Sequence, residues 1–168
     1  MKIGILGGSF DPAHKGHLAI SKEAKRRFKL EKIIWAVTKK NPLKAESKTP
    51  ISKKIKDCKK IIGMNSFIKV KFYENIIKSN KTIDLINYLK KNKNIEIFFL
   101  MGADNLINFH KWFKSKLISQ KCNIIVFDRH GYKKNSLKSK TFKRLNNKTL
   151  TFVEFKKVNI SSSQLRKI

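Results

Sequence analysis

Residues 7–17, GGSFDPAHKGH, connect an apolar segment to the first helical pattern in the chain. The segment before them, KIGILG at 2–7, is short and apolar, as expected of a buried strand. After them, from His17 to Phe28, apolar residues recur with a helical period. The quoted stretch is therefore predicted to be the turn at which a buried strand passes into a helix.

The rest of the chain continues this alternation of strands and helices. Further strands are predicted at 33–37, 67–73, 95–102, 123–129 and 150–155. Helices are predicted at 51–62, 82–91 and, very short, from 161 onward, with a loop at 38–50 and a mobile or weakly helical segment at 130–144. This order predicts an α/β fold, a Rossmann-like single domain over 1–168 with a mostly parallel sheet flanked by helices.

The formal net charge of +29 is the strongest signal in the composition. Lys and Arg number 40, but only five are Arg, and the Lys residues are spread along the chain. A scattered basic surface attracts polyanions without reading their sequence. Ribonucleoprotein and zinc-finger signatures are absent from the sequence. We therefore predict no specific nucleic-acid partner, and a basic nucleic-acid-binding protein stays as the alternative from another class.

The sequence predicts a cytoplasmic protein with no membrane partner. No apolar run reaches the roughly 18 residues that a membrane span needs, and the first apolar stretch is too short for a signal peptide. Cys58 and Cys122 are far apart and lack metal-ligand spacing, as expected in a reducing compartment.

The backbone of the 7–17 turn is suited to a ligand. Gly7 and Gly8 allow a close approach where the strand ends. Phe10 and Pro12 are expected to fix the turn, by packing and by a restricted φ. Ligands of open α/β sheets bind outside the carboxyl ends of strands, which is where this turn falls.

His14 and His17 are the candidate catalytic residues of the turn. They are three residues apart at the start of a helix, so both rings can face one side, beside N–H groups that favour a phosphate. The pair could donate hydrogen bonds to a reacting phosphoryl group or bind a metal. We prefer the first, because a metal site usually needs a third ligand and only Asp11 accompanies the pair. The stretch is neither a P-loop nor a GxGxxG fingerprint.

The same stretch resembles the signature of nucleotidyltransferases with a HIGH-type motif, written GxFxPxHxGH. The six fixed positions are filled by Gly8, Phe10, Pro12, His14, Gly16 and His17. The resemblance implies that both histidines act on the α-phosphate of a nucleotide. It also implies ATP contacts from Gly7, Gly8, Ser9, Phe10 and His17.

A second stretch, ISSSQLR at 160–166, resembles the ISSTxxR signature of the same family. The resemblance implies that this element binds the ATP triphosphate through Ser161, Ser162, Ser163 and Arg166. A Ser-rich helix start is by itself an ordinary capping device. The sequence given ends two residues after Arg166, which predicts a last helix of barely one turn.

The segment MGADNLINFHKWF, 101–113, resembles bacterial nicotinate mononucleotide adenylyltransferases. The resemblance implies that Trp112, with Phe113 beside it, stacks on the pyridine ring of the substrate. It also places Asp104 near a ribose hydroxyl or the metal-bound phosphates. The alternative for Trp112 is a residue that anchors the core.

Two further segments carry substrate contacts in the same family. SNKTIDL, 79–85, resembles the segment at which a Thr and its neighbour meet the nicotinate carboxylate, which implies Thr82 and Ile83. Thr82 is also predicted to be the N-cap of its helix. In NPLK, Leu43 replaces a His of relatives, while Lys44 keeps a cation that could bridge the phosphates.

The resemblance as a whole implies an adenylyltransferase of NAD biosynthesis. It would transfer AMP from ATP to nicotinate mononucleotide, giving deamido-NAD and pyrophosphate, with Mg²⁺ held mainly by the phosphates and no metal site in the protein. Its partners would be these two nucleotides, and a homo-oligomer is also possible. The rival is a phosphopantetheine or cytidylyl-type transferase, whose substrates offer no pyridine ring for Trp112 to stack on.

Overall fold

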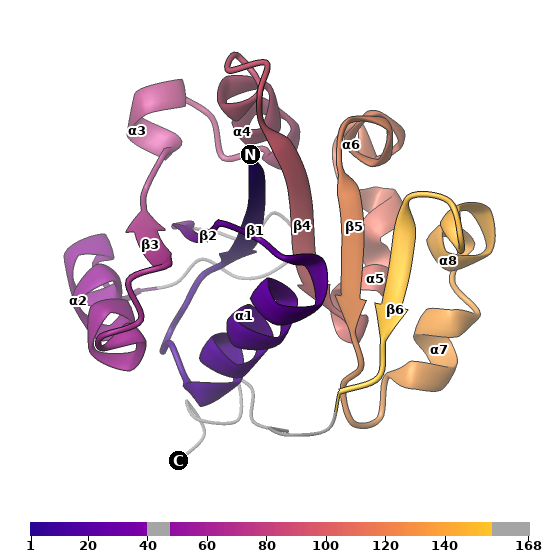
Figure 1. Ribbon diagram of the computed structural model, residues 1–168, viewed down its shortest axis with the longest axis horizontal. Coiled ribbons are helices and arrows are strands. Elements are labelled where there is room, and N and C mark those ends of the chain that lie inside the picture. Colours follow the sequence, from indigo (N-terminus) through magenta and orange to yellow (C-terminus); the bar gives the residue numbers. More distant parts are fainter. Residues whose placement is uncertain (40–47, 156–168) are drawn as a thin grey trace.

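The computed structural model describes residues 1–39 and 48–155. Within these ranges one parallel sheet is formed, with strand order β3-β2-β1-β4-β5-β6 (Figure 1). Its strands are β1 (Lys2–Gly8), β2 (Lys32–Val37), β3 (Ile68–Lys71), β4 (Glu96–Gly102), β5 (Asn123–Phe127) and β6 (Leu150–Val153). The predicted α/β class is confirmed, and every strand pair described is parallel.

Helices cover both faces of this sheet, and Figure 1 shows α1 in front of it and α5 behind. They are α1 (Lys15–Phe28), α2 (Ile51–Ile62), α3 (Glu74–Ile77), α4 (Thr82–Leu89), α5 (Ala103–Asn108), α6 (Ser115–Lys121), α7 (Lys133–Leu137) and α8 (Lys140–Leu145), with a 3₁₀ turn, η1 (Phe109–Lys111). One core joins the sheet to α1 and α2, and the other joins it to α4, α5, α6 and α8.

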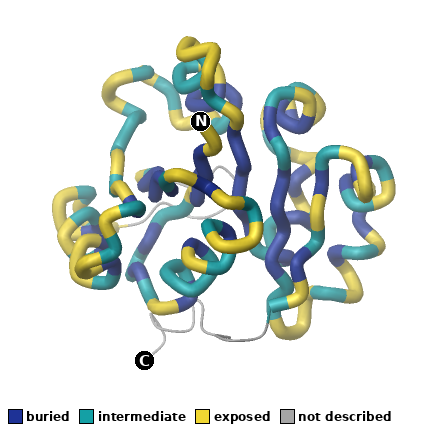
Figure 2. The backbone as a smooth tube through the Cα atoms, in the orientation of Figure 1, coloured by how far each residue is buried: buried dark blue, intermediate teal, exposed yellow. Residues whose placement is uncertain are grey.

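The two cores follow from side-chain alternation along the buried strands. In β4, Phe99 and Met101 enter the core under α4, α5 and α6, whereas Phe98 and Leu100 enter the core under α1 and α2. A strand covered on both faces needs apolar residues at every position. This is why the central strands are continuous apolar runs, and the tube in Figure 2 shows them as the most buried part of the molecule.

The strand order places a crevice beside the end of β1. β1 lies between β2 and β4, and the chain leaves β1 toward one side of the sheet and β4 toward the other. Loops that diverge at such a switch point leave room for a ligand at the carboxyl ends of the strands. The turn of residues 7–17 and the segment after Gly102 are the two sides of this crevice.

Several predicted element boundaries were wrong. Helices α3, α5 and α6, four to seven residues long, were not predicted, because runs this short show little of the helical period. The strand expected to run to Arg129 ends at Phe127, and the one expected at 67–73 is confined to 68–71. Segment 130–144, predicted to be mobile or weakly helical, contains the short helices α7 and α8.

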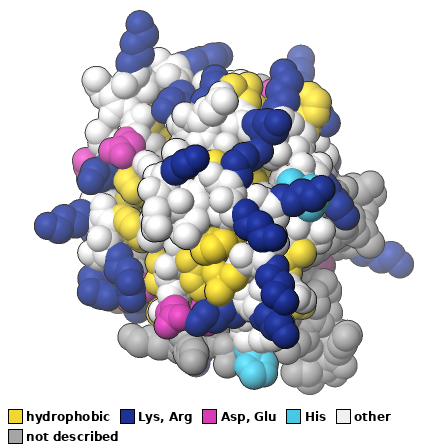
Figure 3. All heavy atoms as spheres, turned by 90° about the vertical axis from the view of Figure 1, so that its right-hand side faces the viewer, with side chains coloured by type: hydrophobic (Ala, Val, Ile, Leu, Met, Phe, Trp, Pro, Cys, Tyr) yellow, Lys and Arg dark blue, Asp and Glu magenta, His cyan; other side chains and the backbone are white. Residues whose placement is uncertain are grey.

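Basic side chains are distributed over the surface. Figure 3 shows Lys and Arg scattered across the face that it views, between hydrophobic and uncharged areas. Over residues 1–39 and 48–155, no helix is both long enough and apolar enough to cross a bilayer.

Candidate active site

The turn after β1 is held by an aromatic cluster. Phe10 is buried and has a left-handed backbone, with φ of 48°, which is unusual for a large side chain. Its ring stacks on Trp35 of β2, with centroids 5.1 Å apart, and lies against the ring of His17 at 4.6 Å. Packing against the buried strand β2 therefore fixes the turn and the histidine ring together, as the sequence predicted for Phe10.

His14 and His17 bind each other's backbone at the start of α1. The N–H of Gly16 donates to Nδ1 of His14 at 3.0 Å, and the N–H of His14 donates to Nδ1 of His17 at 3.1 Å. The helix thus begins at Lys15 with His14 as its N-cap, two residues before the expected start. Because each Nδ1 accepts a hydrogen bond, the proton of each neutral ring is on Nε2. Both rings then offer a single N–H donor on the side away from the helix.

The surroundings keep both imidazoles neutral. Burial, together with the charge of Arg129, lowers the pKa of His14 to about 4. Burial also lowers the pKa of His17 well below its usual value, helped by His14 and Arg129. At neutral pH the pair therefore presents N–H donors and carries no positive charge.

Arg129, just beyond β5, is a residue of the site that sequence reasoning missed. Its Nη1 donates to Oδ2 of Asp104, in the first turn of α5, at 2.6 Å. The other carboxylate oxygen, Oδ1, is buried and has no hydrogen-bond partner among the described residues. The sequence could have indicated Arg129 only by its position, because it follows a buried strand whose end lies at the carboxyl edge of the sheet.

Gly7 and Gly8 end β1 in open surroundings. A Cβ built at Gly7 would meet only the Phe99 ring, at 3.7 Å, and one built at Gly8 would meet the Phe10 ring at 3.6 Å. Both distances are ordinary contacts, so packing within the protein does not require glycine here. The space beside both residues belongs to a pocket. The expectation that they allow a ligand close approach stays a prediction, consistent with this geometry.

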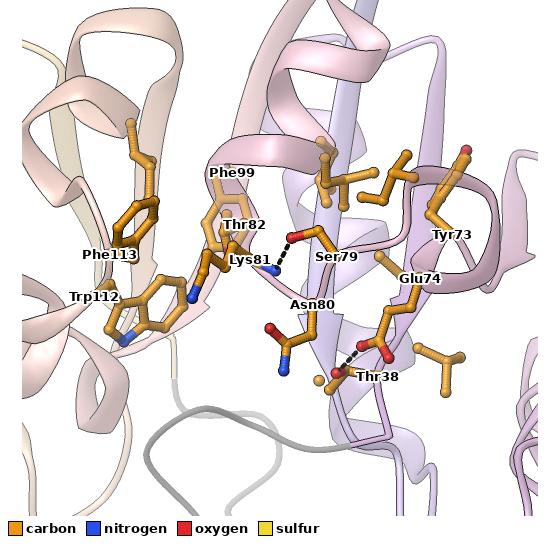
Figure 4. Close-up of a pocket in the computed structure, with 18 of the residues that line it drawn as sticks. Thr38, Tyr73, Glu74, Ser79, Asn80, Lys81, Thr82, Phe99, Trp112 and Phe113 are labelled. Carbon is orange, nitrogen blue, oxygen red and sulfur yellow. Dashed lines mark hydrogen bonds between the residues drawn. The ribbon is translucent and has the colours of Figure 1, made fainter.

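The pocket lies between the ends of β1 and β2, the start of α4 and the aromatic segment after α5 (Figure 4). Its volume is about 140 Å³. A protein cavity of about 150 Å³ holds benzene, so this space suits one six-membered aromatic ring. Its polar and aromatic lining comes from Gly7, Gly8, Thr38, Tyr73, Glu74, Ser79, Asn80, Lys81, Thr82, Phe99, Asn105, Lys111, Trp112 and Phe113.

Trp112 forms one wall of this pocket and is partly buried. Its ring meets Phe99 of β4 edge-on, at 5.9 Å and 89°, and packs against Phe109 at 5.2 Å. Both partners are buried in the core. Trp112 is therefore held rigidly by the core while it lines the pocket, so the two predicted roles are compatible in one residue. Phe113 is half exposed at the pocket rim.

The start of α4 forms the opposite wall, and here one prediction was wrong. Lys81, not Thr82, is the N-cap, and Thr82 is the first helical residue. No side chain of the described residues caps the helix, and Ser79 holds the segment before it: its hydroxyl donates to Oδ2 of Asp84 at 2.6 Å and accepts the N–H of Lys81 at 3.1 Å. The side chain of Ile83 is buried in the core, so a substrate could reach Ile83 only through its backbone.

The first two N–H groups of α4 point to no acceptor within the described ranges. The N–H groups of Asp84 and Leu85 both donate to the carbonyl of Lys81, whereas those of Thr82 and Ile83 have no partner in this part of the chain. Free N–H groups at a helix start favour an anion.

Glu74, at the start of α3, is a further pocket residue that the sequence did not indicate. Its carboxylate accepts a hydrogen bond from the hydroxyl of Thr38, which follows β2 (Figure 4). The backbone N–H of Thr38 donates to the carbonyl of Gly8, at 3.0 Å. Its backbone carbonyl accepts from the buried ammonium of Lys54, also at 3.0 Å. These contacts tie β1, β2, α2 and α3 together at the pocket. No spacing in the sequence links these residues.

The structure thus places the predicted residues in two adjoining groups. Thr82, Trp112 and Phe113 line the pocket, while Asp104 lies with Arg129 outside its lining. Gly7 and Gly8 line the pocket and begin the turn that carries His14 and His17. The predictions for Lys44, Ser161, Ser162, Ser163 and Arg166 fall outside the described residues.

Metal-ligating side chains do not cluster in residues 1–39 and 48–155: no group of three or more His, Cys, Asp or Glu could hold an ion there. Asp104 is already paired with Arg129. Both cysteines are buried thiols, Cys58 and Cys122, whose pKa burial raises to about 12.

A parallel α/β sheet with a histidine pair at its switch point is the arrangement that the resemblance to nucleotidyltransferases predicted. The family model described as cytidylyltransferase-like matches residues 5–168. Solved structures agree with the fold. The Plasmodium falciparum nicotinic acid mononucleotide adenylyltransferase complexed with NaAD matches with a TM-score of 0.81, covering 99% of this chain and 82% of that one. At 22% identity, this likeness supports the fold.

Relatives in sequence narrow the class. The probable nicotinate-nucleotide adenylyltransferase of Pelagibacter ubique (strain HTCC1062) is 68% identical over 167 residues, covering 99% of this chain and 93% of the relative. The protein of the same description from Agrobacterium fabrum (strain C58 / ATCC 33970) is 36% identical over 133 residues, covering 78% and 71%. The chain belongs to the nicotinate-nucleotide adenylyltransferase family.

Proposed function

We propose that this protein transfers AMP from ATP to nicotinate mononucleotide, giving deamido-NAD and pyrophosphate. The observation that carries the proposal is the paired N-terminal cap of α1, which aims the Nε2–H donors of His14 and His17 away from the helix. Beside them is a pocket of the right size for one pyridine ring, walled by Trp112. Membership of the nicotinate-nucleotide adenylyltransferase family supports the same reaction.

The reaction needs alignment and charge stabilisation more than a covalent intermediate. The 5′-phosphate of nicotinate mononucleotide attacks the α-phosphorus of ATP in line, a new P–O bond forms, and the bond to the bridging oxygen of pyrophosphate breaks. The attacking phosphate is already ionised, so no general base is required. His14 and His17 donate to the α-phosphoryl oxygens, where negative charge must be stabilised in the transition state.

The pyridine nucleotide would bind across the pocket. Trp112 would stack on the ring, and the free N–H groups of Thr82 and Ile83 would donate to the ring substituent. Asp104 would meet a ribose hydroxyl only if its buried Oδ1 rotates out from beside Gly102. Lys44, Ser161, Ser162, Ser163 and Arg166 keep their predicted roles toward the phosphates.

A magnesium ion fits this site as a companion of ATP rather than as a resident ion. The described residues offer no cluster of ligands for it, and Mg²⁺ readily keeps waters while it binds phosphate oxygens. When bound, it would neutralise charge on the triphosphate. A cytoplasmic location is also proposed, and it rests on the sequence and on the proposed reaction.

The test is pyrophosphate release by the purified protein with ATP and Mg²⁺. Nicotinate mononucleotide, nicotinamide mononucleotide and phosphopantetheine are offered in parallel. A clear preference for the first supports the reaction and the pocket. Turnover of phosphopantetheine alone would keep the phosphoryl chemistry and reject the pyridine pocket, and turnover of none of the three would reject the proposal.

A further inference from the structure

Lys81 occupies the pocket rim with a fixed backbone and an exposed side chain. It is the N-cap of α4, and its N–H donates to Oγ of Ser79 at 3.1 Å. Ser79 is itself held by Asp84, at 2.6 Å. Lys81 is thus linked through Ser79 to Asp84 in the first turn of α4. These hydrogen bonds fix the position of the Lys81 backbone relative to the helix.

The ammonium of Lys81 points across the pocket mouth. Nζ is 4.6 Å from the ring centroid of Phe113, and Figure 4 shows the side chain reaching toward Trp112 and Phe113. No carboxylate in the described ranges forms an ion pair with it. Glu74 is the only acidic residue in the described pocket lining, and it accepts from Thr38. The cation is therefore held by an aromatic face and keeps its capacity to pair with an anion.

By themselves, the N–H groups of Thr82 and Ile83 distinguish only weakly between a carboxylate and a carboxamide on the pyridine ring. Both a carboxylate and a carboxamide present an oxygen that can accept these hydrogen bonds. A positive charge at the rim adds an attraction that only the ionised substituent gains. A cation adds to the preference for an anion that the helix start already gives. Lys81 carries one on this wall, and Lys111 carries another on the side of Trp112.

We infer that Lys81 determines specificity in this protein by pairing its ammonium with the carboxylate of a pyridine nucleotide stacked on Trp112. The inference rests on the proposed function and names the side chain by which that site would prefer the acid over the amide. Phe113 acts as a positioning residue, because its ring holds the ammonium at the rim when the pocket is empty.

Lys114 provides a matched control. Its Nζ lies over the same Phe113 ring, at 5.3 Å, but Lys114 is not among the residues that line the pocket. Removing its charge changes the net charge and the contacts of Phe113 as much as a change at Lys81 does. The two positions therefore differ chiefly in whether the ammonium faces the pocket.

The experiment compares kcat/KM for nicotinate and nicotinamide mononucleotide at saturating ATP in wild type, Lys81→Met, Lys81→Arg and Lys114→Met. Lys81→Met should lower kcat/KM for the acid about three- to fivefold and leave the amide within about 1.5-fold, as expected for one exposed ion pair. The acid-to-amide ratio should recover within about threefold in Lys81→Arg. It should be unchanged in Lys114→Met.

Calorimetric titration of each protein with the two mononucleotides separates this inference from the proposed reaction. If only Lys81→Met binds nicotinate mononucleotide more weakly, the inference is supported by a measurement that does not depend on turnover. Equal losses for acid and amide, or an unchanged ratio, would overturn it while leaving the adenylyl transfer intact. A wild type that neither binds nor turns over either mononucleotide would overturn both.

Discussion

Replacing His14 by Asn or by Ala separates its two roles in the structure. Nδ1 of His14 caps α1 by accepting from Gly16, at 3.0 Å, and Nε2–H is the donor proposed to act on ATP. Asn supplies a side-chain oxygen that caps a helix as well as any residue, but it has no donor at the position of Nε2. Ala supplies neither group. Both substitutions remove the ring contact with His17, at a centroid distance of 3.9 Å, so the difference between them isolates the cap.

The structure sets the expected magnitudes. His14→Ala should be less stable than His14→Asn by about 1 kcal/mol, the usual cost of losing an N-cap. Both variants should lose kcat by on the order of 10²–10³, the effect of removing one transition-state donor. The hydrogen bond from the backbone N–H of His14 to His17 remains available in both, so His17 should keep its orientation. ATP binding should change little.

The assays are pyrophosphate release at saturating substrates and urea unfolding followed by circular dichroism. His17→Ala serves as the companion variant, with a loss of kcat of the same order expected. If His14→Asn kept a kcat within about threefold of wild type, the Nε2–H donor would have no part in the reaction. If the Asn and Ala variants were equally stable, the capping role would be refuted.

Three further outcomes are expected. Trp112→Ala should raise KM for nicotinate mononucleotide far more than KM for ATP, because the ring lines the pocket and stacking is lost; equal increases in steady-state kinetics would leave only the core role. Gly102→Ala should lower the free energy of unfolding by about 1 kcal/mol, because its Cβ would lie 2.6 Å from Oδ1 of Asp104 and the ion pair with Arg129 opposes movement of that carboxylate. Urea unfolding indistinguishable from wild type would contradict this packing. The pKa of His14 is about 4 in the folded protein, below its usual value of about 6.5. Between these two pH values the unfolded chain therefore binds more protons than the folded protein. The free energy of unfolding should fall as the pH falls through this window. Solvent screening of this partly buried ring limits the contribution of His14 to on the order of 1–2 kcal/mol. His14→Asn should lose that contribution and keep the part due to His17, so unfolding measured at both ends of the window should show a smaller fall in stability than in wild type.

The fold could be read from the sequence because its strands are buried on both faces. Segments such as 95–102 are apolar at every position, and only a sheet covered by helices on both sides requires that pattern. Short helices were missed for the opposite reason. The four residues of α3 are all at least partly exposed, so their sequence carries no helical period.

The histidine site was predictable because it is local. His14, Gly16 and His17 lie within one helical turn, and their spacing by itself places both rings at the start of α1. The misassigned cap of α4 shows the limit of such local reasoning. Thr82 is a good capping residue, but the carbonyl of Lys81 accepts from the N–H groups of Asp84 and Leu85, so the helix begins one residue earlier than a Thr82 cap would allow.

By itself the sequence determined the α/β class, the turn that carries the two histidines and the family, because burial of whole strands and contacts within one turn leave direct patterns along the chain. Only the tertiary structure decided that Arg129 holds Asp104 and helps keep the histidines neutral, and that Lys81 and Phe113 meet at the rim of one pocket. These pairs join residues that are 25 and 32 positions apart. Their contacts depend on which strands lie side by side at the carboxyl edge of the sheet, and no spacing in the sequence records that order.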